Sequence, residues 1–241
     1  MLFSIITPCY NSEKTIARTL ESVFNQTFKD YEYIIIDGGS SDNTLDIIND
    51  YINKFGKKMT VVSEPDEGIY DAMNKGIKMA KGDIVGIVNS DDYYEPKCLE
   101  YVVKHYNSSL PLQILYGMMR IINERQEELG IRFNHHRNME VEIINHPASF
   151  VTKRLYEKYG CYNIKYKSAA DFDFMLKMVN EKDVVFKPVY KILTNFTRGG
   201  MSGSYVGIQE DNDVRYCHGL VSTKKYWLTK SKNTLKHMLG V

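Results

Sequence analysis

Two adjacent carboxylates follow a short apolar run in the first half of the chain. Residues 83–88 (DIVGIV) have the β-branched, apolar character of a buried parallel strand, and Asn89, Ser90, Asp91 and Asp92 come directly after it. Paired carboxylates disfavour each other's ionised form unless a positive group lies beside them. Open α/β sheets bind ligands outside the carboxyl ends of their strands, so this position favours a ligand site. The alternative is an Asx-rich turn that caps the next helix.

Polar groups also follow three earlier apolar runs. The predicted strands cover residues 3–7, 33–36, 59–63 and 83–88, and they end in the segments 8–11 (PCYN), 37–42 (DGGSSD), 64–68 (EPDEG) and 89–92 (NSDD). Amphipathic helices are predicted between them at 12–24, with Ser12 as N-cap, at 44–54 and at 70–80. This alternation predicts a parallel sheet with right-handed crossovers, which brings all four polar segments to one edge.

Composition and charge exclude several classes of protein. The 241 residues are 43% hydrophobic and 25% charged, which is typical of a globular enzyme, and a net charge of +1 gives no overall field for nucleic acid. Cys9, Cys98, Cys161 and Cys217 are far apart, so neither a zinc knuckle nor a disulfide framework is indicated. The first residues carry no basic leader and no apolar stretch reaches membrane-spanning length. A cytoplasmic location is therefore expected.

The missing phosphate-binding motifs narrow the kind of site. No Gly-x-Gly-x-x-Gly follows the first strand and no Gly-x-x-x-x-Gly-Lys-Ser/Thr occurs, which disfavours a dinucleotide fold and a P-loop. Mg²⁺ and Mn²⁺ typically take one or two carboxylates together with phosphate oxygens. The pattern therefore suggests a nucleotide diphosphate that is held through a metal ion.

Four segments together resemble a known family. Residues 4–11 (SIITPCYN), 36–44 (IDGGSSDNT), 68–76 (GIYDAMNKG) and 90–92 (SDD) are similar, in this order, to the family 2 glycosyltransferases of the GT-A fold. The closest resemblance is to small bacterial members that build capsule, O-antigen or exopolysaccharide repeat units. The resemblance implies an α/β, mostly parallel central sheet flanked by helices. It divides a single domain, 1–213, into a Rossmann-like nucleotide-sugar-binding half (1–95) and an acceptor and catalytic-base half (96–213).

The resemblance also implies roles for individual residues. Pro8, Tyr10 and Asp37 would hold the nucleoside of the donor, for which a UDP-sugar is favoured; Tyr10 offers a ring face and Asp37 an acceptor for a base N–H. Asp92 would be the main ligand of Mn²⁺ or Mg²⁺, while Asp91 would contact the ribose or donor sugar and serve as a second ligand. Asp42 is expected to cap the second helix. The remaining donor-binding candidates are Asn11, Asn74, Lys75 and Arg198.

Two positions depart from the family pattern. The family often has an acid where Asn89 stands, and its usual arginine is replaced in Ala72-Met73-Asn74 by Met73. Lys75 or Arg198 could supply the missing positive charge, and the sequence does not choose between them.

The second half of the chain carries weaker matches. Residues 169–176 (AADFDFML) resemble the acidic motif that opens a helix and supplies the catalytic base, which favours Asp171, with Asp173 as the alternative. His146, in the segment 145–150 (NHPASF), has either a structural or a substrate-contacting role. Residues 198–202 (RGGMS) resemble the glycine-rich loop that closes over the donor in relatives.

The predicted function is transfer of a single sugar, with inversion, from a nucleotide-diphosphate sugar to a carbohydrate acceptor in bacterial surface polysaccharide synthesis. A polyprenyl-diphosphate-linked acceptor is one candidate, and no Gln-x-x-Arg-Trp of the processive branch occurs. The alternatives are a nucleotidyltransferase and a non-catalytic sugar-nucleotide-binding module. Residues 214–241 contain six basic and no acidic side chains together with apolar residues. This basic amphipathic tail is predicted to make peripheral contact with the inner face of the membrane or with the acceptor, with a solvated, frayed terminus as the alternative.

Overall fold

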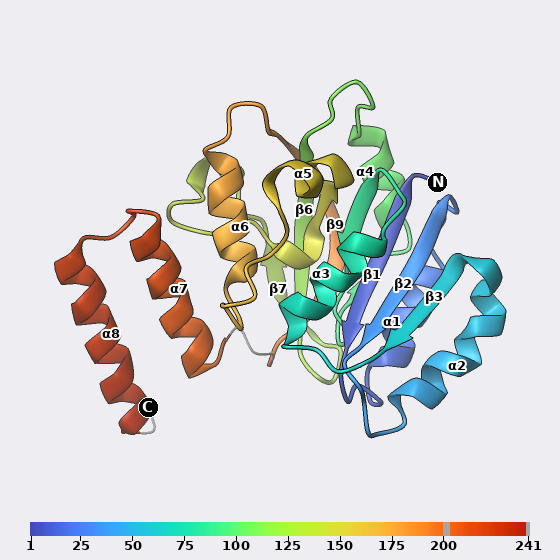
Figure 1. Cartoon of the computed structure of the whole chain (residues 1–241), viewed down its shortest axis with the longest axis horizontal. Coiled ribbons are helices and arrows are strands. Elements are labelled where there is room, and N and C mark those ends of the chain that lie inside the picture. The colour runs from blue at the N-terminus through green and yellow to red at the C-terminus, as the bar shows by residue number, and fades with distance from the viewer. Residues whose placement is uncertain (200–202, 240–241) are drawn as a thin grey trace.

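The computed structural model describes residues 1–199 and 203–239. Within these residues nine strands form one sheet in the order β3-β2-β1-β4-β8-β6-β9-β5, and β7 pairs with β6 (Figure 1). The first four are parallel: β1 (Phe3–Cys9), β2 (Tyr31–Asp37), β3 (Met59–Ser63) and β4 (Ile84–Ile87). The others are β5 (Tyr93–Tyr94), β6 (Gln113–Ile122), β7 (Glu128–Arg132), β8 (Ser149–Thr152) and β9 (Val185–Thr197). Because only β5, β7 and β8 run antiparallel to their described neighbours, the predicted mostly parallel α/β sheet is confirmed.

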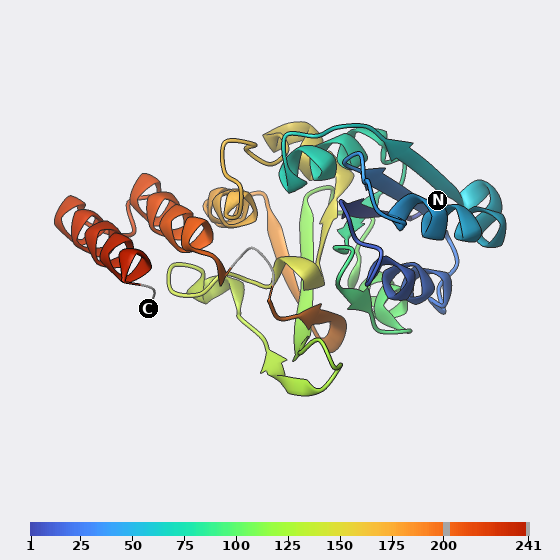
Figure 2. The same cartoon turned by 90° about the horizontal axis from the view of Figure 1, so that it is seen from below.

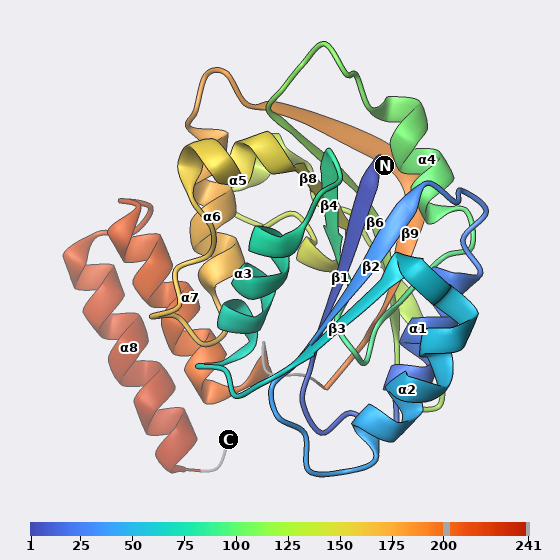
Figure 3. The same ribbon diagram turned by 45° about the vertical axis from the view of Figure 1, so that its right-hand side comes forward.

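Helices cover both faces of this sheet (Figure 3). On one face lie α3 (Ile69–Met79), α5 (Lys153–Tyr159) and α6 (Ala170–Val179), and on the other α1 (Ile16–Phe24), α2 (Thr44–Phe55) and α4 (Cys98–His105). Side chains alternate along each strand, so Ile34 and Ile36 of β2 join the first core cluster and Tyr33 and Ile35 join the second. The two apolar layers fix the register that brings the strand ends together.

The start of the chain differs from the sequence prediction in two details. Pro8 does not break the first strand, which continues to Cys9; β4 is paired only as far as Ile6, so Pro8 has just β2 beside it. The first helix begins at Ile16 and not at residue 12. Ser12 is not its N-cap, because the Ser12 hydroxyl contacts the hydroxyl of Ser90 instead. The third strand and the start of the second helix at Thr44 agree with the prediction.

The end of the chain is a helical hairpin at the outer edge of the molecule. It consists of α7 (Tyr205–Cys217) and α8 (Thr223–Met238), and α8 lies farthest from the β1–β4 half (Figures 1 and 2). The predicted boundary between residues 213 and 214 falls inside α7, so the segment that stands apart is the whole hairpin. No helix in the described part of the chain is long and apolar enough to cross a lipid bilayer.

Candidate active site

The loop that follows β4 is anchored by α1. Thr19 is fully buried on α1, and its hydroxyl lies 2.6 to 3.4 Å from the carbonyl oxygens of Asn89, Ser90 and Asp92. A 3.1 Å hydrogen bond from the Asp92 N–H to the Asn89 carbonyl closes the turn. Ser12 and Ser90 meet with their hydroxyl oxygens 2.7 Å apart. These contacts hold the loop rigidly, as positioned ligands require.

The two carboxylates of this loop have different surroundings. Asp92 is fully buried; its Oδ1 accepts a 2.8 Å hydrogen bond from the Thr197 N–H, and the Asn89 amide lies 3.5 Å from its Oδ2. Asp91 is half-buried, and among residues 1–199 and 203–239 its carboxylate accepts a hydrogen bond only from its own backbone. Asp91 is therefore the carboxylate that is available to a ligand, whereas Asp92 ties the loop to β9.

The electrostatics of the pair indicate a need for positive charge. Burial raises the pKa of the Asp92 carboxyl well above its usual range, and the charge of Asp91 raises it further. Burial also raises the pKa of the Asp91 carboxyl. The Thr197 N–H and the Arg18 guanidinium oppose the shift at Asp92, and Arg18 opposes it at Asp91. A cation beside the pair would favour the ionised form of both groups.

Arg18 is a site residue that the sequence did not identify. Its Nη2 donates to the Asp91 carbonyl at 2.7 Å and lies 3.1 Å from the Thr197 hydroxyl, while its guanidinium lies 4.8 Å from the centre of the Tyr93 ring. Its Nε is buried and has no partner within the described residues. The contact joins residues that are 73 positions apart in the chain, so no local sequence spacing could have predicted it.

The loop has the donor set of a hard-cation site. Asp91, Asp92 and the Asn89 side chain offer oxygen atoms, and the Asn89 Oδ1 is buried without a hydrogen-bond partner among the described residues. No cluster of three or more acidic, histidine or cysteine ligands occurs in residues 1–199 and 203–239. Mg²⁺ and Mn²⁺ suit such a sparse set, since they retain ligands from phosphate or water. The residues present therefore fit a cation that shares its coordination with a phosphorylated ligand.

Asp37 organises the loop after β2. It is fully buried; its Oδ2 accepts hydrogen bonds from the N–H groups of Gly39 (3.2 Å) and Ser40 (3.1 Å) and from the Ser63 hydroxyl (2.7 Å). Its Oδ1 accepts from the Ser40 hydroxyl at 2.5 Å. Asp37 thus shapes the edge of the site, and its direct contact with a nucleoside stays a prediction that these bonds argue against.

Tyr10, Gly38 and Asp66 converge at the ends of β1, β2 and β3. Tyr10 is 62% exposed, so its ring is open to a ligand. A Cβ atom on Gly38 would lie 2.5 Å from the Asp66 Oδ2 and 3.4 Å from the Tyr10 ring, so a larger residue here would displace the Asp66 carboxylate. Asp66 uses Oδ1 to accept from the Gly68 N–H at 2.9 Å. The sequence marked the segment 64–68 as a polar strand end but did not select Asp66.

Other predicted residues support this edge. Pro8 is buried in β1. Asn11 has a positive φ of 48°, and its Oδ1 accepts from the Ser41 N–H at 2.9 Å. Asp42 accepts a hydrogen bond from the Thr44 N–H, so it caps α2 although the N-cap position itself is Asn43. Its second carboxylate oxygen accepts from the Glu13 N–H and holds the loop before α1.

Asn74 has no free polar atom. Its Nδ2 donates to the Tyr162 carbonyl at 2.8 Å and its Oδ1 accepts from the Tyr162 N–H at 3.0 Å, both in the interior. Asn74 therefore fastens α3 to the segment that leads into α6. Its predicted contact with the donor remains a prediction, and this pair of bonds argues against it.

Lys75 and Arg198 differ in availability. The Lys75 ammonium is held by the Pro65 carbonyl at 2.9 Å, by Glu64 at 3.0 Å and by Asp71 at 3.4 Å. Arg198 is exposed directly after Thr197, and its backbone N–H donates to the Ile122 carbonyl at 2.9 Å. Within residues 1–199 and 203–239 the Arg198 side chain has no ion-pair partner, and it follows Thr197, whose N–H is bonded to Asp92. Gly200, Met201 and Ser202, the rest of the predicted glycine-rich loop, lie outside the described residues.

Asp171 stands in the first turn of α6 and is held by α3. Its Oδ1 accepts a 2.7 Å hydrogen bond from the hydroxyl of Tyr70, a buried residue at the start of α3 that also lies 2.9 Å from the Ser168 carbonyl. The amino end of a helix favours a negative charge. Asp173 faces elsewhere, since its Oδ1 is bonded to His218 Nε2 at 2.8 Å. Asp171 and Asp173, the two candidates for the base, are therefore bonded to different parts of the chain.

His146 belongs to a buried network below Asp171. Its Nε2 lies 3.0 Å from the Tyr162 hydroxyl, which in turn lies 3.0 Å from that of Tyr156. Burial lowers the pKa of His146, which favours the neutral ring. These contacts support a structural role.

Glu210 of α7 caps the start of α6, where the N-cap residue Ala169 offers no side-chain hydrogen bond. Its carboxylate accepts from the N–H groups of Lys167 (2.8 Å), Ser168 (2.7 Å) and Ala169 (3.2 Å). Asp171 is therefore positioned by two distant helices, directly through Tyr70 of α3 and through the segment before α6 by Glu210 of α7. Sequence reasoning missed both residues, because each contact depends on the tertiary fold.

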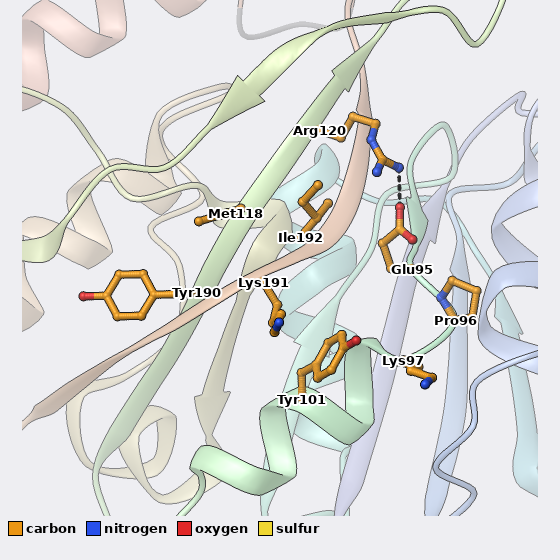
Figure 4. A pocket seen from close by; sticks show the side chains of 9 residues that line it. All are labelled: Glu95, Pro96, Lys97, Tyr101, Met118, Arg120, Tyr190, Lys191 and Ile192. Atoms are coloured by element: carbon orange, nitrogen blue, oxygen red, sulfur yellow. Dashed lines mark hydrogen bonds and ion pairs between the residues drawn. The ribbon is translucent and has the colours of Figure 1, made fainter.

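A separate cleft of about 530 Å³ lies beside β6, β9 and α4 (Figure 4). Glu95 and Arg120 form an ion pair across it, and the Lys191 ammonium lies 5.7 Å from the centre of the Tyr101 ring. None of the predicted site residues lines this cleft. The carboxylate loop and this cleft are therefore different features.

Several proteins are similar to this chain in sequence, and several solved structures are similar to it in fold. The chain is 32% identical, over 85% of its length and 80% of theirs, to the PGL/p-HBAD biosynthesis glycosyltransferases of Mycobacterium tuberculosis and Mycobacterium bovis. It is 31% identical to the hyaluronan synthase of Pasteurella multocida, but spans 22% of that protein. Among solved structures, S. aureus TarS with UDP-GlcNAc superimposes with a TM-score of 0.72 at 24% identity, over 98% of this chain and 72% of that one. The mannosyltransferase PcManGT of Pyrobaculum calidifontis, with GDP-Man and Mn²⁺, gives 0.65 at 17% identity, over 90% and 62%.

At these identities the two structures establish the fold alone. The family described as Glycosyl transferase family 2 matches residues 4–170, which contain the carboxylate loop, Tyr10, Asp37 and the segment leading into α6. The sequence resemblance is thus confirmed independently of the structural likeness. This chain belongs to glycosyl transferase family 2 and is a glycosyltransferase.

Proposed function

We propose that the protein moves one sugar, with inversion, from a nucleotide-diphosphate sugar to a hydroxyl group of a carbohydrate acceptor. One observation carries the proposal: acidic groups from two different elements are held at one end of the molecule. Asp91 follows β4 and Asp171 begins α6, and the amino ends of α3 and α6 lie at the same end as the carboxyl ends of β1–β4 (Figure 1). Inversion needs one group on the leaving-group side of the sugar and another on the acceptor side, and two separate elements can supply them.

Asp171 is the proposed general base. Its Oδ2 takes the proton of the acceptor hydroxyl while that oxygen bonds to the anomeric carbon, and the bond from this carbon to the diphosphate oxygen breaks with both electrons. Tyr70 holds Oδ1, which leaves Oδ2 for the acceptor. Asp173 is the weaker candidate because its carboxylate is bonded to His218.

The proposed donor is a UDP-sugar. Support comes from the exposed ring of Tyr10 and from the Asp66 Oδ2, an acceptor next to Gly38 that suits the N–H of a uracil ring. Asp37 and Asn11 shape this edge, with Pro8 packed behind it. The structures of S. aureus TarS in complex with UDP and with UDP-GlcNAc support this choice.

The proposed cofactor is Mn²⁺ or Mg²⁺, with Asp91 as its principal protein ligand and Asp92 behind it. This reverses the order expected from the sequence, because Asp92 is fully buried and bonded to Thr197, whereas Asp91 is half-buried and its carboxylate is not bonded to any other described residue. A bound cation would stabilise the charge of the departing diphosphate. Arg18 and Arg198 are the protein cations placed to assist, and Lys75 is already engaged with Glu64 and Asp71. The Mn²⁺ in the PcManGT complex supports this part of the proposal.

The proposed acceptor is a growing glycan or glycoconjugate of the bacterial surface, with a polyprenyl-diphosphate carrier as the candidate anchor. The names of the relatives, a PGL/p-HBAD biosynthesis glycosyltransferase and hyaluronan and chondroitin synthases, support this class. Acceptor choice is assigned to residues 110–150, since loops on a rigid scaffold carry specificity.

The test begins with thermal shifts of the purified protein in the presence of UDP-GlcNAc, UDP-glucose and GDP-mannose, each with Mn²⁺ or with EDTA. A donor at a hundred times its Kd stabilises the fold by about 2.7 kcal/mol. We expect one UDP-sugar to raise the Tm only with the metal, and then to release UDP when an acceptor is added, with the opposite anomeric configuration in the product. Release of pyrophosphate would instead identify a nucleotidyltransferase. Binding without turnover across an acceptor panel would identify a binding module, and full turnover in EDTA would exclude the metal.

A further inference from the structure

Helix α8 turns its polar side toward the protein. Its inner face meets α7 through hydrogen bonds: the Tyr226 hydroxyl and the Lys230 ammonium both donate to Asp213, at 2.8 and 2.9 Å, and the Thr234 hydroxyl accepts from Gln209 at 3.1 Å. Stacked rings complete the contact, Tyr216 on Tyr226 and Tyr205 on His237. The contact between the two helices is therefore polar and aromatic, without an aliphatic core.

The outer face of α8 and the residue after it carry large apolar side chains. The exposed fractions are 59% for Trp227, 70% for Leu228, 58% for Leu235, 77% for Met238 and 68% for Leu239. At a period of 3.6 residues these positions gather on one side of the helix, away from α7. Figure 2 shows α8 as the outermost element, and no other element of residues 1–199 or 203–239 lies over this side. Large apolar side chains exposed together on one side of a helix mark an interaction surface.

Positive charge borders this face. Lys224, Lys225, Lys232 and Lys236 are exposed on α8, and the helix contains no acidic residue. The other two basic residues of the predicted tail are engaged in ion pairs, Lys230 with Asp213 and Arg215 with Asp211. Tyr226, predicted as an apolar anchor, is likewise buried against α7. The free lysines and the apolar stripe thus occupy the outer side together.

We propose that α8 lies in the surface of a lipid bilayer that contains anionic lipids. Apolar side chains enter the boundary of the acyl chains while lysine side chains extend to phosphate headgroups. Tryptophan, here Trp227, is favoured at that boundary. A second copy of this chain fits less well, because it would bring two sets of four lysines together without an acid on either helix.

This inference is independent of the transfer chemistry, because it rests on the side of the hairpin that faces away from the carboxylates. Helix α7 lies between α8 and α6, so a bilayer held by α8 lies on the far side of the hairpin from the start of α6 (Figure 2).

Trp227 is the only tryptophan of the chain, so its fluorescence reports on α8 directly. The full-length protein is mixed with vesicles of phosphatidylcholine alone and of phosphatidylcholine with phosphatidylglycerol, and binding is followed by emission and by co-sedimentation. We expect a blue shift and sedimentation with the anionic vesicles only, and weaker binding as salt is raised. An unchanged emission spectrum and no sedimentation with either vesicle would overturn the proposal.

Paired variants separate specific from general effects. Lys232→Gln with Lys236→Gln is expected to weaken vesicle binding about 25-fold, since each lysine near an anionic surface contributes about fivefold. Leu235→Ser with Met238→Ser removes apolar contact and should abolish the blue shift. The control, Lys57→Gln with Lys182→Gln, removes two exposed lysines elsewhere and should bind as the parent does. Binding that survives both α8 variants refutes the proposal, as does a concentration-dependent dimer without vesicles that alone shifts the Trp227 emission. All substituted positions are exposed, and an unchanged Tm verifies folding.

Discussion

Replacing Asn74 by alanine distinguishes a structural role from donor binding. The sequence resemblance assigns Asn74 to the donor, whereas in the structure both of its side-chain polar atoms are bonded to the backbone of Tyr162. Asn74→Ala leaves the N–H and the carbonyl of Tyr162 without partners in the interior. Tyr162 also packs on Phe174 of α6, with ring centres 5.3 Å apart, so the disturbance reaches the helix that carries Asp171.

The magnitude follows from the two lost partners. Each buried backbone group left without a hydrogen bond costs about 1–3 kcal/mol, which gives about 2–6 kcal/mol for the pair. Alanine is a better helix former than asparagine, and this offsets roughly 0.5 kcal/mol within α3. For a chain of this size each kcal/mol lowers the Tm by about 2–4 °C. The Asn74→Ala protein should therefore melt roughly 5–20 °C below the parent.

The assay combines urea and thermal unfolding with calorimetric titration of UDP in Mn²⁺, at a temperature where the variant is folded. We expect the free energy of unfolding to fall, the UDP affinity to change less than about threefold and kcat to decrease. Asn49→Ala is the matched control, because Asn49 is exposed in the middle of α2. An unchanged Tm together with a large loss of UDP affinity would refute this reasoning and return Asn74 to the donor site.

Three further predictions concern the acidic groups. Asp91→Asn should weaken Mn²⁺-dependent UDP binding by about tenfold or more, as loss of a metal contact does, whereas Asp92→Asn should stabilise the metal-free protein. Burial raises the folded-state pKa of Asp92, so ionisation of this carboxyl lowers the stability of the protein as pH rises above the unfolded-state pKa of about 3.9. The gain in Tm from Asp92→Asn, measured in EDTA, should therefore grow from acid to neutral pH. No such gain would appear if the pKa of Asp92 were not raised. Asp171→Asn should lower kcat by about 10² to 10⁴ with UDP affinity intact, while Asp173→Asn should keep most of the turnover; the reverse pattern in single-turnover rates would reassign the base. Glu210→Gln should lower stability by about 1–3 kcal/mol and reduce kcat without changing the UDP affinity, compared with the exposed Glu124→Gln, and equal Tm values for these two variants would contradict the cap.

Local patterns were sufficient for the first half of the fold. The apolar runs at β1 to β4 and the helical spacing between them are short-range signals, and the resulting parallel sheet follows from crossover geometry. The same reasoning failed for β9, whose sequence contains Pro188 and two lysines and whose strand character depends on pairing with β6 and β5. The predicted tail, 214–241, includes α8 but only the last four residues of α7, because the surface that joins the two helices is a tertiary contact that local patterns do not show.

The site residues divide in a similar way. Residue types at strand ends identified Asp91, Asp92 and Asp37. Their individual roles, however, depend on which of their carboxylate oxygens already accept hydrogen bonds within the fold. Asp92 is bonded to Thr197 and Asp37 to Ser40 and Ser63, contacts that no spacing rule contains. Arg18 could not be identified from the sequence for the same reason, because only its contacts in the folded structure mark it as a site residue.

The hydrogen bonds of Glu210 couple local unfolding of the α7–α8 hairpin to local unfolding at the start of α6. Local opening of the α7–α8 hairpin withdraws the carboxylate from the backbone N–H groups of residues 167–169, so these amides should exchange with solvent at the rate set by the hairpin and not by α6, which begins at Ala170. The β1–β4 half would stay folded during such an event. Given the proposed role of Asp171 as base, the chain would lose and regain its catalytic geometry by a local, reversible unfolding reaction, and whatever holds the hairpin would also set the fraction of molecules that are competent for transfer.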